Sequence, residues 1–494
     1  MKRIPASAFA RLIPLLVAAS APAAAQITFQ EMAGFTGLPS GANGAGIVLG
    51  LVEADTNGST TINDYRASRA GITFTYQDAA DPTQTYGFSG HANTVMARYA
   101  DAATGVTQVI NTEALSFYNR HLGITATGYP TASVSSPVSD VINLSFIFNN
   151  LSDSTAGAIE ARTDYLTSKW NKVVVAGVST SGGIIATPGS AYNAISVAEL
   201  NQTYTAPNRT NLDTTGGPTP GRLKPDLLAP SNPNTSVGGA APSFAAPVVS
   251  AAAAVLLQTA RATPALSAAT DARVIKSLLL TGATKLDGWS AAPSNQPLDY
   301  DQGAGVVHAA NSHELLLAGR APASVSVAHG LAGWDLGTVT EPAGPSLAEA
   351  WYYVDLSEAQ AAAGFTVTAT LAWNRAVADD LATVTLRNLD LQLYSVVNGT
   401  FTPSTALATS NSTLDNVEHI YASFGAGVTT RYAFRVGGVG FGNGVSETYA
   451  LSWNIVPDLA SPIPEPAQFG LLAGLAGLGL AATRRRRSPG AARN

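Results

Sequence analysis

Residues 141–176 read VINLSFIFNNLSDSTAGAIEARTDYLTSKWNKVVVA, and this stretch decides the fold. Val141–Phe148 is a short, mostly apolar run, which is typical of a strand buried on both faces. Ala158–Trp170 places its apolar residues along one helical face. Val173–Ala176 is a second apolar run of strand length. The order strand, helix, strand predicts a parallel sheet with right-handed crossovers.

The same alternation extends over the first two thirds of the chain. Ile47–Val52 and Ala194–Ala198 are further predicted strands. We therefore expect residues 26–319 to form an α/β domain with a doubly wound, mostly parallel sheet. Active sites in such sheets lie at the carboxyl ends of the strands.

After Gly319 the pattern changes to apolar residues alternating with polar or small ones, with Gly- and Asn-rich turns between the runs. This pattern predicts an all-β sandwich of antiparallel strands over residues 320–457. The segments that carry it are Phe365–Trp373, Leu389–Val396, Tyr432–Val436 and Tyr449–Val456.

The composition excludes several classes of protein. Of the 494 residues, 46% are hydrophobic and 12% are charged, which argues against disorder. The net charge is −6 although both ends are basic, so the body is acidic and nucleic acid is not an expected partner. The absence of cysteine excludes disulfides, thiolate metal sites and cysteine nucleophiles.

The first 25 residues predict a secretory signal peptide. Lys2 and Arg3 precede an apolar stretch at Leu12–Ala19, and Ala23–Ala25 suits cleavage before Gln26. A membrane anchor is the weaker reading because the apolar stretch is short. The sequence therefore predicts an exported protein.

The C-terminal residues 462–494 have the features of a second targeting signal. Pro464–Pro466 (PEP) precedes the uncharged stretch 467–483, which is long enough for a membrane-crossing helix, and Arg484–Arg487 follows it. This arrangement resembles the PEP-CTERM sorting signal of Gram-negative bacteria. The resemblance implies transient membrane contact, removal of the tail by an exosortase-like enzyme, and delivery to the cell surface or extracellular matrix. A permanent C-terminal anchor uses the same residues and stays open.

Ser243 stands at the head of a long Ala/Val/Leu helix. Free N–H groups and the positive end of the helix dipole at such a position help to stabilise an oxyanion. Taken alone, however, Ser243 is more simply read as a helix N-cap.

The sequence around Ser243 favours a catalytic role instead. Ser243–Leu257 (SFAAPVVSAAAAVLL) resembles the nucleophile motif of the subtilases, usually Gly-Thr-Ser-x-Ala-x-Pro. Lys224–Pro230 resembles the strand that precedes the nucleophile there, while Val274–Thr284 and Gln302–Val307 resemble the closing helix and GxG turn. The resemblance spans about residues 44–310. It implies a subtilisin-like fold and a serine endopeptidase that hydrolyses peptide bonds of proteins or peptides through an acyl-enzyme.

The resemblance also assigns the partners of Ser243. Gly90–Ala97 resembles the start of the helix that carries the family's histidine, which makes His91 the general base. The acid should end the first strand, where Glu53 stands in place of the family's aspartate and Asp55 follows two residues later. A two-residue shift keeps the same strand face, so periodicity leaves both open. We favour Glu53 as the residue that orients His91.

Two departures from the family pattern affect the oxyanion site. The family's Ala-Gly-Asn-x-Gly element corresponds here to Val175–Gly182, which has no asparagine, and Ser179 is the nearest side-chain donor. Ala241-Pro242 also replaces the Gly-Thr before the nucleophile. A catalytically weak or inactive subtilase-like surface or matrix binding protein is therefore the alternative function.

We predict no required cofactor. Asp55–Gly58, Asn388–Leu391 and Asp415–His419 offer oxygen ligands that suit structural calcium, but solvated turns are the simpler interpretation. The second domain resembles the β-sandwich that follows the catalytic domain in many secreted bacterial subtilases, which implies a structural or substrate-binding role.

Overall fold

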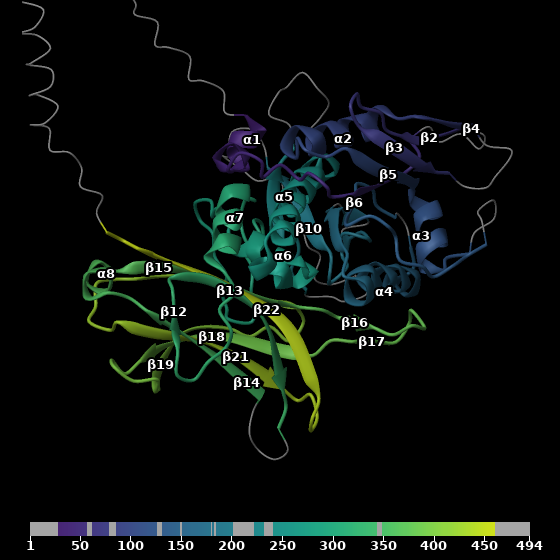
Figure 1. The fold of residues 1–494 in the computed structure, drawn as a ribbon. Coiled ribbons are helices and arrows are strands. Elements are labelled where there is room, and N and C mark those ends of the chain that lie inside the picture. The colour runs from purple at the N-terminus through teal and green to yellow at the C-terminus, as the bar shows by residue number, and fades with distance from the viewer. Residues whose placement is uncertain are drawn as a thin grey trace, which may run out of the picture.

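The computed structural model describes residues 28–56, 62–78, 85–125, 131–148, 151–178, 180–181, 184–200, 222–231, 241–342 and 348–459. The predicted signal peptide (1–25), the PEP-CTERM segment (462–494) and its helix (467–483) lie outside these residues. Figure 1 shows two packed regions, an α/β region and an all-β region.

A seven-stranded sheet forms the centre of the α/β region, and every neighbouring pair of its strands is parallel. Strand β1 has β5 on one side and β6 on the other, so the chain order reverses at β1. Ligands bind at such switch points, beyond the carboxyl ends of the strands. The strands, in spatial order, are β11 (Leu227–Pro230), β10 (Ile195–Leu200), β7 (Val173–Gly177), β6 (Val141–Leu144), β1 (Leu49–Glu53), β5 (Gln108–Glu113) and β3 (Thr73–Gln77).

Alternate residues of the strands enter two different cores, because successive side chains point to opposite faces. Val173 and Val175 of β7 belong to the core beneath α2 and α5, whereas Val174 and Ala176 belong to the core beneath α3 and α4. This confirms the predicted doubly wound α/β fold. The main helices are α2 (Gly90–Ala102), α3 (Ala114–Leu122), α4 (Asp153–Trp170), α5 (Pro242–Ala262), α6 (Ala272–Thr281) and α7 (Ala309–Ala318).

Short elements complete this region. They are α1 (Phe29–Met32), η1 (Phe35–Gly37), η2 (Pro264–Thr270) and the strand pairs β2 (Ile62–Arg66) with β4 (Thr85–Phe88) and β8 (Thr180–Ser181) with β9 (Ile184–Ile185).

Helix α5 runs through the middle of the α/β region (Figure 1). Among the described residues it is the one helix long and apolar enough to cross a membrane, but most of it is buried inside the protein. Its alanines and valines pack against β6, β7 and β10. It is therefore the central core helix, and it carries Ser243 in its first turn.

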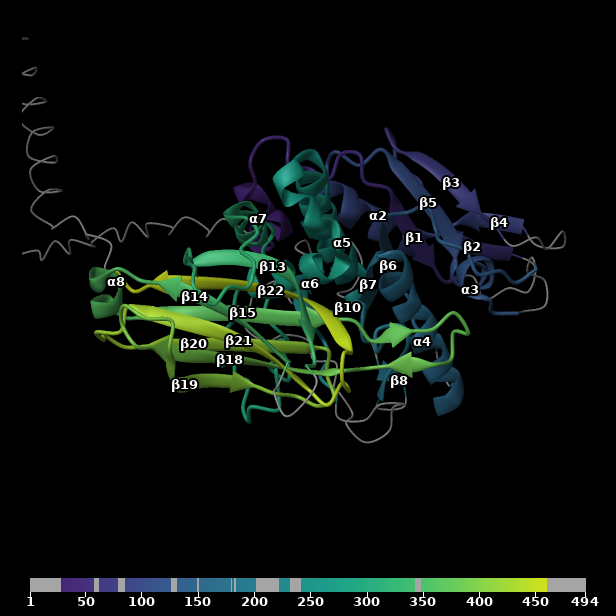
Figure 2. The ribbon, with the colours of Figure 1, turned by 60° about the horizontal axis from the view of Figure 1, so that its bottom comes forward.

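The second region is a sandwich of a five-stranded and a four-stranded sheet, which confirms the predicted all-β fold (Figure 2). Its core lies between the two sheets and includes Trp453, Phe434 and Leu391. The five-stranded sheet contains β12 (Ala328–His329), β14 (Ala348–Asp355), β21 (Arg431–Val439), β18 (Asn388–Val396) and β19 (Pro403–Ser410); the four-stranded sheet contains β13 (Ala332–Thr340), β22 (Ser446–Pro457), β15 (Phe365–Trp373) and β20 (Val417–Phe424). A short helix, α8 (Glu358–Ala363), precedes β15.

The two regions share one hydrophobic core. Trp334, Ala372, Val417 and Ala450 of the sandwich belong to the same buried cluster as α5 and α6. The Ser277 hydroxyl on α6 donates to the Thr370 carbonyl at 2.8 Å. The sandwich is thus packed onto the α/β region through buried contacts.

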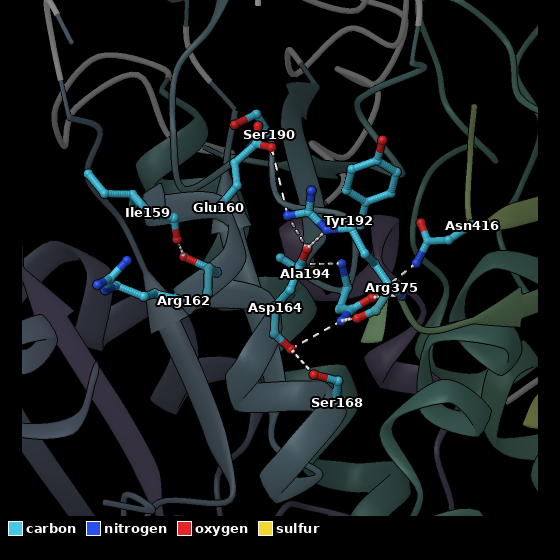
Figure 3. Close-up of polar contacts among 12 residues, drawn as sticks. Ile159, Glu160, Arg162, Asp164, Ser168, Ser190, Tyr192, Ala194, Arg375 and Asn416 are labelled. Atoms are coloured by element: carbon cyan, nitrogen blue, oxygen red, sulfur yellow. Dashed lines mark hydrogen bonds and ion pairs between the residues drawn. The ribbon is translucent and has the colours of Figure 1, made fainter. Parts of the chain in front are cut away.

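A hairpin of the sandwich, β16 (Ala376–Val377) with β17 (Val384–Thr385), extends along α4 (Figures 1 and 2). Val377 and Leu381 enter the core beneath α3 and α4. At the base of the hairpin the Arg375 Nε donates to Asp164 Oδ2 at 2.6 Å, and both side chains are almost fully buried (Figure 3).

Candidate active site

His91 lies in the first turn of α2, which starts beside the carboxyl end of β1. The Ser89 hydroxyl caps this helix by accepting hydrogen bonds from the His91 and Ala92 N–H groups at 3.1 and 3.2 Å. A capped first turn holds the backbone of His91 in one conformation. Its imidazole is 28% exposed, so a substrate can reach it.

Glu53 is the last residue of β1 and is fully buried. Its Oε2 lies 2.8 Å from His91 Nδ1, and its Oε1 is buried without a hydrogen-bond partner. Asp55 instead accepts a hydrogen bond from the Asp64 backbone N–H at 2.8 Å. Of the two carboxylates that periodicity left open, the structure therefore brings Glu53 to the imidazole.

The environment of the Glu53–His91 pair shifts the pKa of both side chains. Burial raises the pKa of Glu53, and this outweighs the lowering effect of the hydrogen bond and charge of His91. Burial also lowers the pKa of His91, but the hydrogen bond to Glu53 and its charge outweigh it, so the pKa of His91 lies above its ordinary value. The imidazole thus holds a proton more tightly than a free histidine, as a base that must stabilise its charged form requires.

Ser243 is the second residue of α5, after Pro242. The N-cap of α5 is Ala241, and among the residues that the structure describes no side chain caps this helix, whereas Ser89, Glu113, Ser152 and Asp271 cap α2, α3, α4 and α6. The first N–H groups of a helix have no partner within it, so the uncapped α5 leaves the Ser243 N–H available to a ligand. Ser243 does not act as the N-cap.

Helices α2 and α5, which carry His91 and Ser243 in their first turns, pack against each other. The ring of Phe244, the residue after Ser243, lies 5.3 Å from the imidazole ring between centroids. Within the described part of the chain, Glu53 holds the imidazole and no hydrogen bond joins it to the Ser243 hydroxyl. Catalytic hydrogen bonds are often long before substrate binds and tighten in the complex.

Gly177, at the end of β7, allows the start of α5 to approach the sheet. A Cβ at this position would lie 3.1 Å from the carbonyl carbon of Pro242 and 3.4 Å from the Ser243 nitrogen. The oxyanion site expected here includes Ser179, but Ser179 lies outside the described residues. Its role stays a prediction.

Two contacts at the start of α5 were not expected from the sequence. One is the Phe244 ring against His91. The other is the Ser145 hydroxyl, which donates to the Ser243 carbonyl at 2.9 Å. Polar residues in the apolar run Val141–Phe148 were the available signal, because buried polar groups need hydrogen-bond partners. The strand also ends earlier than predicted, at Leu144, which leaves Ser145 free to turn toward α5.

No group of three or more His, Asp or Glu residues is arranged to hold a metal ion among the residues that the structure describes. The expectation of no required cofactor and the calcium alternative both stay predictions.

The comparison with protein families agrees with this geometry. Residues 80–305 match the model of the subtilase family, peptidase S8. The match covers less than half of the chain and includes His91 and Ser243 but begins after Glu53. Residues 80–305, within the α/β region, are thus similar to the subtilase family. No curated protein sequence matches the chain significantly.

Several proteases are among the solved structures to which the chain is similar. A serine protease of Aeromonas sobria is 12% identical with a TM-score of 0.35, and the match covers 84% of this chain and 89% of that one. Pseudomonas sedolisin, a serine-carboxyl proteinase, is 12% identical with a TM-score of 0.37, covering 58% and 96%. The epidermin leader peptide processing serine protease of Staphylococcus aureus is 13% identical with a TM-score of 0.34, covering 57% and 77%.

Proposed function

We propose that this protein is an exported, surface-sorted subtilisin-like serine endopeptidase. Ser243 attacks the peptide carbonyl, His91 accepts and returns the proton, and Glu53 orients His91. The observation that carries the proposal is the Glu53–His91 hydrogen bond beside the uncapped end of α5. A buried acid, a partly exposed histidine and a serine at a free helix terminus are the parts that acyl transfer needs.

The reaction would proceed in two halves. The Ser243 hydroxyl loses its proton to His91 Nε2 as its oxygen attacks the substrate carbonyl, while Glu53 stabilises the imidazolium through Nδ1. His91 then gives the proton to the leaving amine, and an acyl-enzyme remains on Ser243. Water, activated by His91, hydrolyses this ester and restores the serine.

The oxyanion site separates this function from its alternative. The Ser243 N–H at the start of α5 is one donor. In place of the family's asparagine the chain offers Ser179, and removing one oxyanion donor typically lowers kcat by about 10²–10³-fold. A slow peptidase is consistent with this set of donors, and a subtilase-like binding protein without catalysis is the second candidate.

Labelling with a fluorescent fluorophosphonate tests the proposal. The secreted body, residues 26–461, should react at one serine, and Ser243→Ala and His91→Ala should abolish the signal. Ser277→Ala is the matched control, because Ser277 is a fully buried serine on α6. Folded wild-type protein that does not react would favour the binding-protein alternative.

Export and sorting are tested by mass. The proposal expects the surface-associated protein to begin at Gln26 and to lack the hydrophobic stretch 467–483 and the Arg484–Arg487 tail. A surface form that keeps this stretch would instead indicate a permanent anchor.

A further inference from the structure

Helix α5 has a proline, Pro247, four residues after Ser243. In an α-helix the carbonyl of residue i accepts a hydrogen bond from the N–H of residue i+4, but proline has no N–H. The Ser243 carbonyl therefore lacks its usual helical partner. A carbonyl in this position needs another donor, because a buried unpaired carbonyl is costly.

The Ser145 hydroxyl supplies that donor. Its Oγ lies 2.9 Å from the Ser243 oxygen, and Ser145 is 3% exposed. Ser145 directly follows β6, the strand next to β1 at the point where the strand order reverses. This hydrogen bond thus links the backbone of Ser243 to the carboxyl-terminal edge of the sheet, where Glu53 also lies.

Two further buried side chains fix the Ser145 hydroxyl. Asn143 Nδ2 donates to Ser145 Oγ at 2.8 Å, so the hydroxyl accepts from Asn143 and directs its own proton to Ser243. Ser250 Oγ lies 3.0 Å from Asn143 Oδ1 and also 3.1 Å from the Ala246 carbonyl. The network therefore connects the end of β6 to α5 at Ser243 and at Ser250, which is about two turns further along the helix.

We propose that Ser145, oriented by Asn143, is a positioning residue for Ser243. This inference rests on the proposed peptidase function. Fixing the Ser243 carbonyl sets the rotation of the Ser243–Phe244 peptide, and with it the place of the Phe244 ring against His91. It also limits movement of the first turn of α5, where the Ser243 N–H and hydroxyl must meet the substrate.

The test separates positioning from simple hydrogen-bond satisfaction. Ser145→Ala removes the donor, Ser145→Thr keeps a hydroxyl, and Ser277→Ala is the matched control. Ser277 is fully buried and donates to a carbonyl, that of Thr370, at 2.8 Å, but it lies at the sandwich contact. Each Ala variant loses two hydrogen bonds, since Ser145 also accepts from Asn143 and Ser277 also bonds to the Ser452 hydroxyl. We therefore expect their melting temperatures to fall by similar amounts.

The readouts are the rate of fluorophosphonate labelling and kcat and KM on a peptide ester. In Ser145→Ala we expect the labelling rate and kcat to fall by about 10–100-fold with KM little changed, as for a displaced reacting group. Ser145→Thr should recover most of this loss, and Ser277→Ala should keep the wild-type rate. Wild-type labelling in Ser145→Ala, or an equal loss in Ser277→Ala, would overturn the proposal.

A second measurement does not depend on catalysis. Hydrogen exchange of the peptide 241–250 should be faster in Ser145→Ala than in the wild type and unchanged in Ser277→Ala. If the wild type does not label, the peptidase function fails, but faster exchange would still show that Ser145 fixes the Ser243 turn. Unchanged exchange in Ser145→Ala would refute the positioning role in either case.

Discussion

Asp164 and Glu53 are both buried carboxylates with cationic or ionisable partners, but their surroundings differ. Asp164, at the contact with the sandwich, accepts from Arg375 Nε at 2.6 Å and from the Asn193 N–H at 2.7 Å, and all three residues are buried (Figure 3). Glu53 meets one partner, His91, which is 28% exposed, and its second oxygen has none.

The difference separates a structural pair from a reactive one. The Asp164–Arg375 pair joins the two regions through a planar guanidinium that donates to a buried carboxylate. Histidine gains and loses its proton near neutral pH, so the Glu53–His91 pair can exist in two protonation states. Both carboxylates are buried, but only Glu53 has a partly exposed partner that can exchange a proton with a substrate.

The largest expected effect is that of His91→Ala. We expect peptide hydrolysis to fall by about 10⁶-fold, because the nucleophile loses its base. The protein should still unfold cooperatively, although its melting temperature should fall because the buried Glu53 loses its partner. Steady-state kinetics and thermal unfolding measure the two quantities. Activity within tenfold of the wild type would remove His91 from the mechanism.

Glu53→Gln should lower kcat by about 10⁴-fold, as the corresponding change does in a serine protease triad. It also moves the pH profile. In the wild type, activity should rise with pH through a value above 6.5, because the pKa of His91 is raised and neutral His91 is the base. Loss of the Glu53 charge lowers that pKa, so the acidic limb should move to lower pH. If the acidic limb of the pH profile does not move, the proposed pairing of Glu53 with His91 is contradicted.

Arg375→Met tests the structural role of the Asp164–Arg375 pair. Removing Arg375 leaves Asp164 buried without its cation, and this should lower the free energy of unfolding by about 3–5 kcal/mol. The control is Lys169→Met, since Lys169 and Asp379 form an exposed pair at the same contact and should contribute much less to the free energy of unfolding. Equal losses in urea titrations would contradict the distinction.

Asp55→Asn should have the smallest effect. Asp55 accepts a hydrogen bond from the Asp64 backbone, whereas Glu53 is hydrogen-bonded to the imidazole, so the fluorophosphonate labelling rate should stay within about twofold of the wild type. A loss as large as that of Glu53→Gln would return the acid role to Asp55.

The local pattern of the sequence was sufficient to predict the fold class. The apolar runs at β6, β7 and β15 predicted buried strands, because the length and periodicity of an apolar run can be read from the local sequence. The motifs around His91 and Ser243 were legible for the same reason: each occupies the head of a helix whose sequence is continuous.

Only the tertiary structure decided which groups meet. Glu53 and Asp55 are two residues apart, so strand periodicity places both on the same face. Which of them reaches His91 depends on the distance between α2 and β1. Ser145 and Ser243 are 98 residues apart, and Arg375 and Asp164 are 211 apart. Such contacts arise from the packing of helices and sheets, which no local pattern encodes. The sequence by itself therefore determined the elements and their chemistry, and the packing determined their partners.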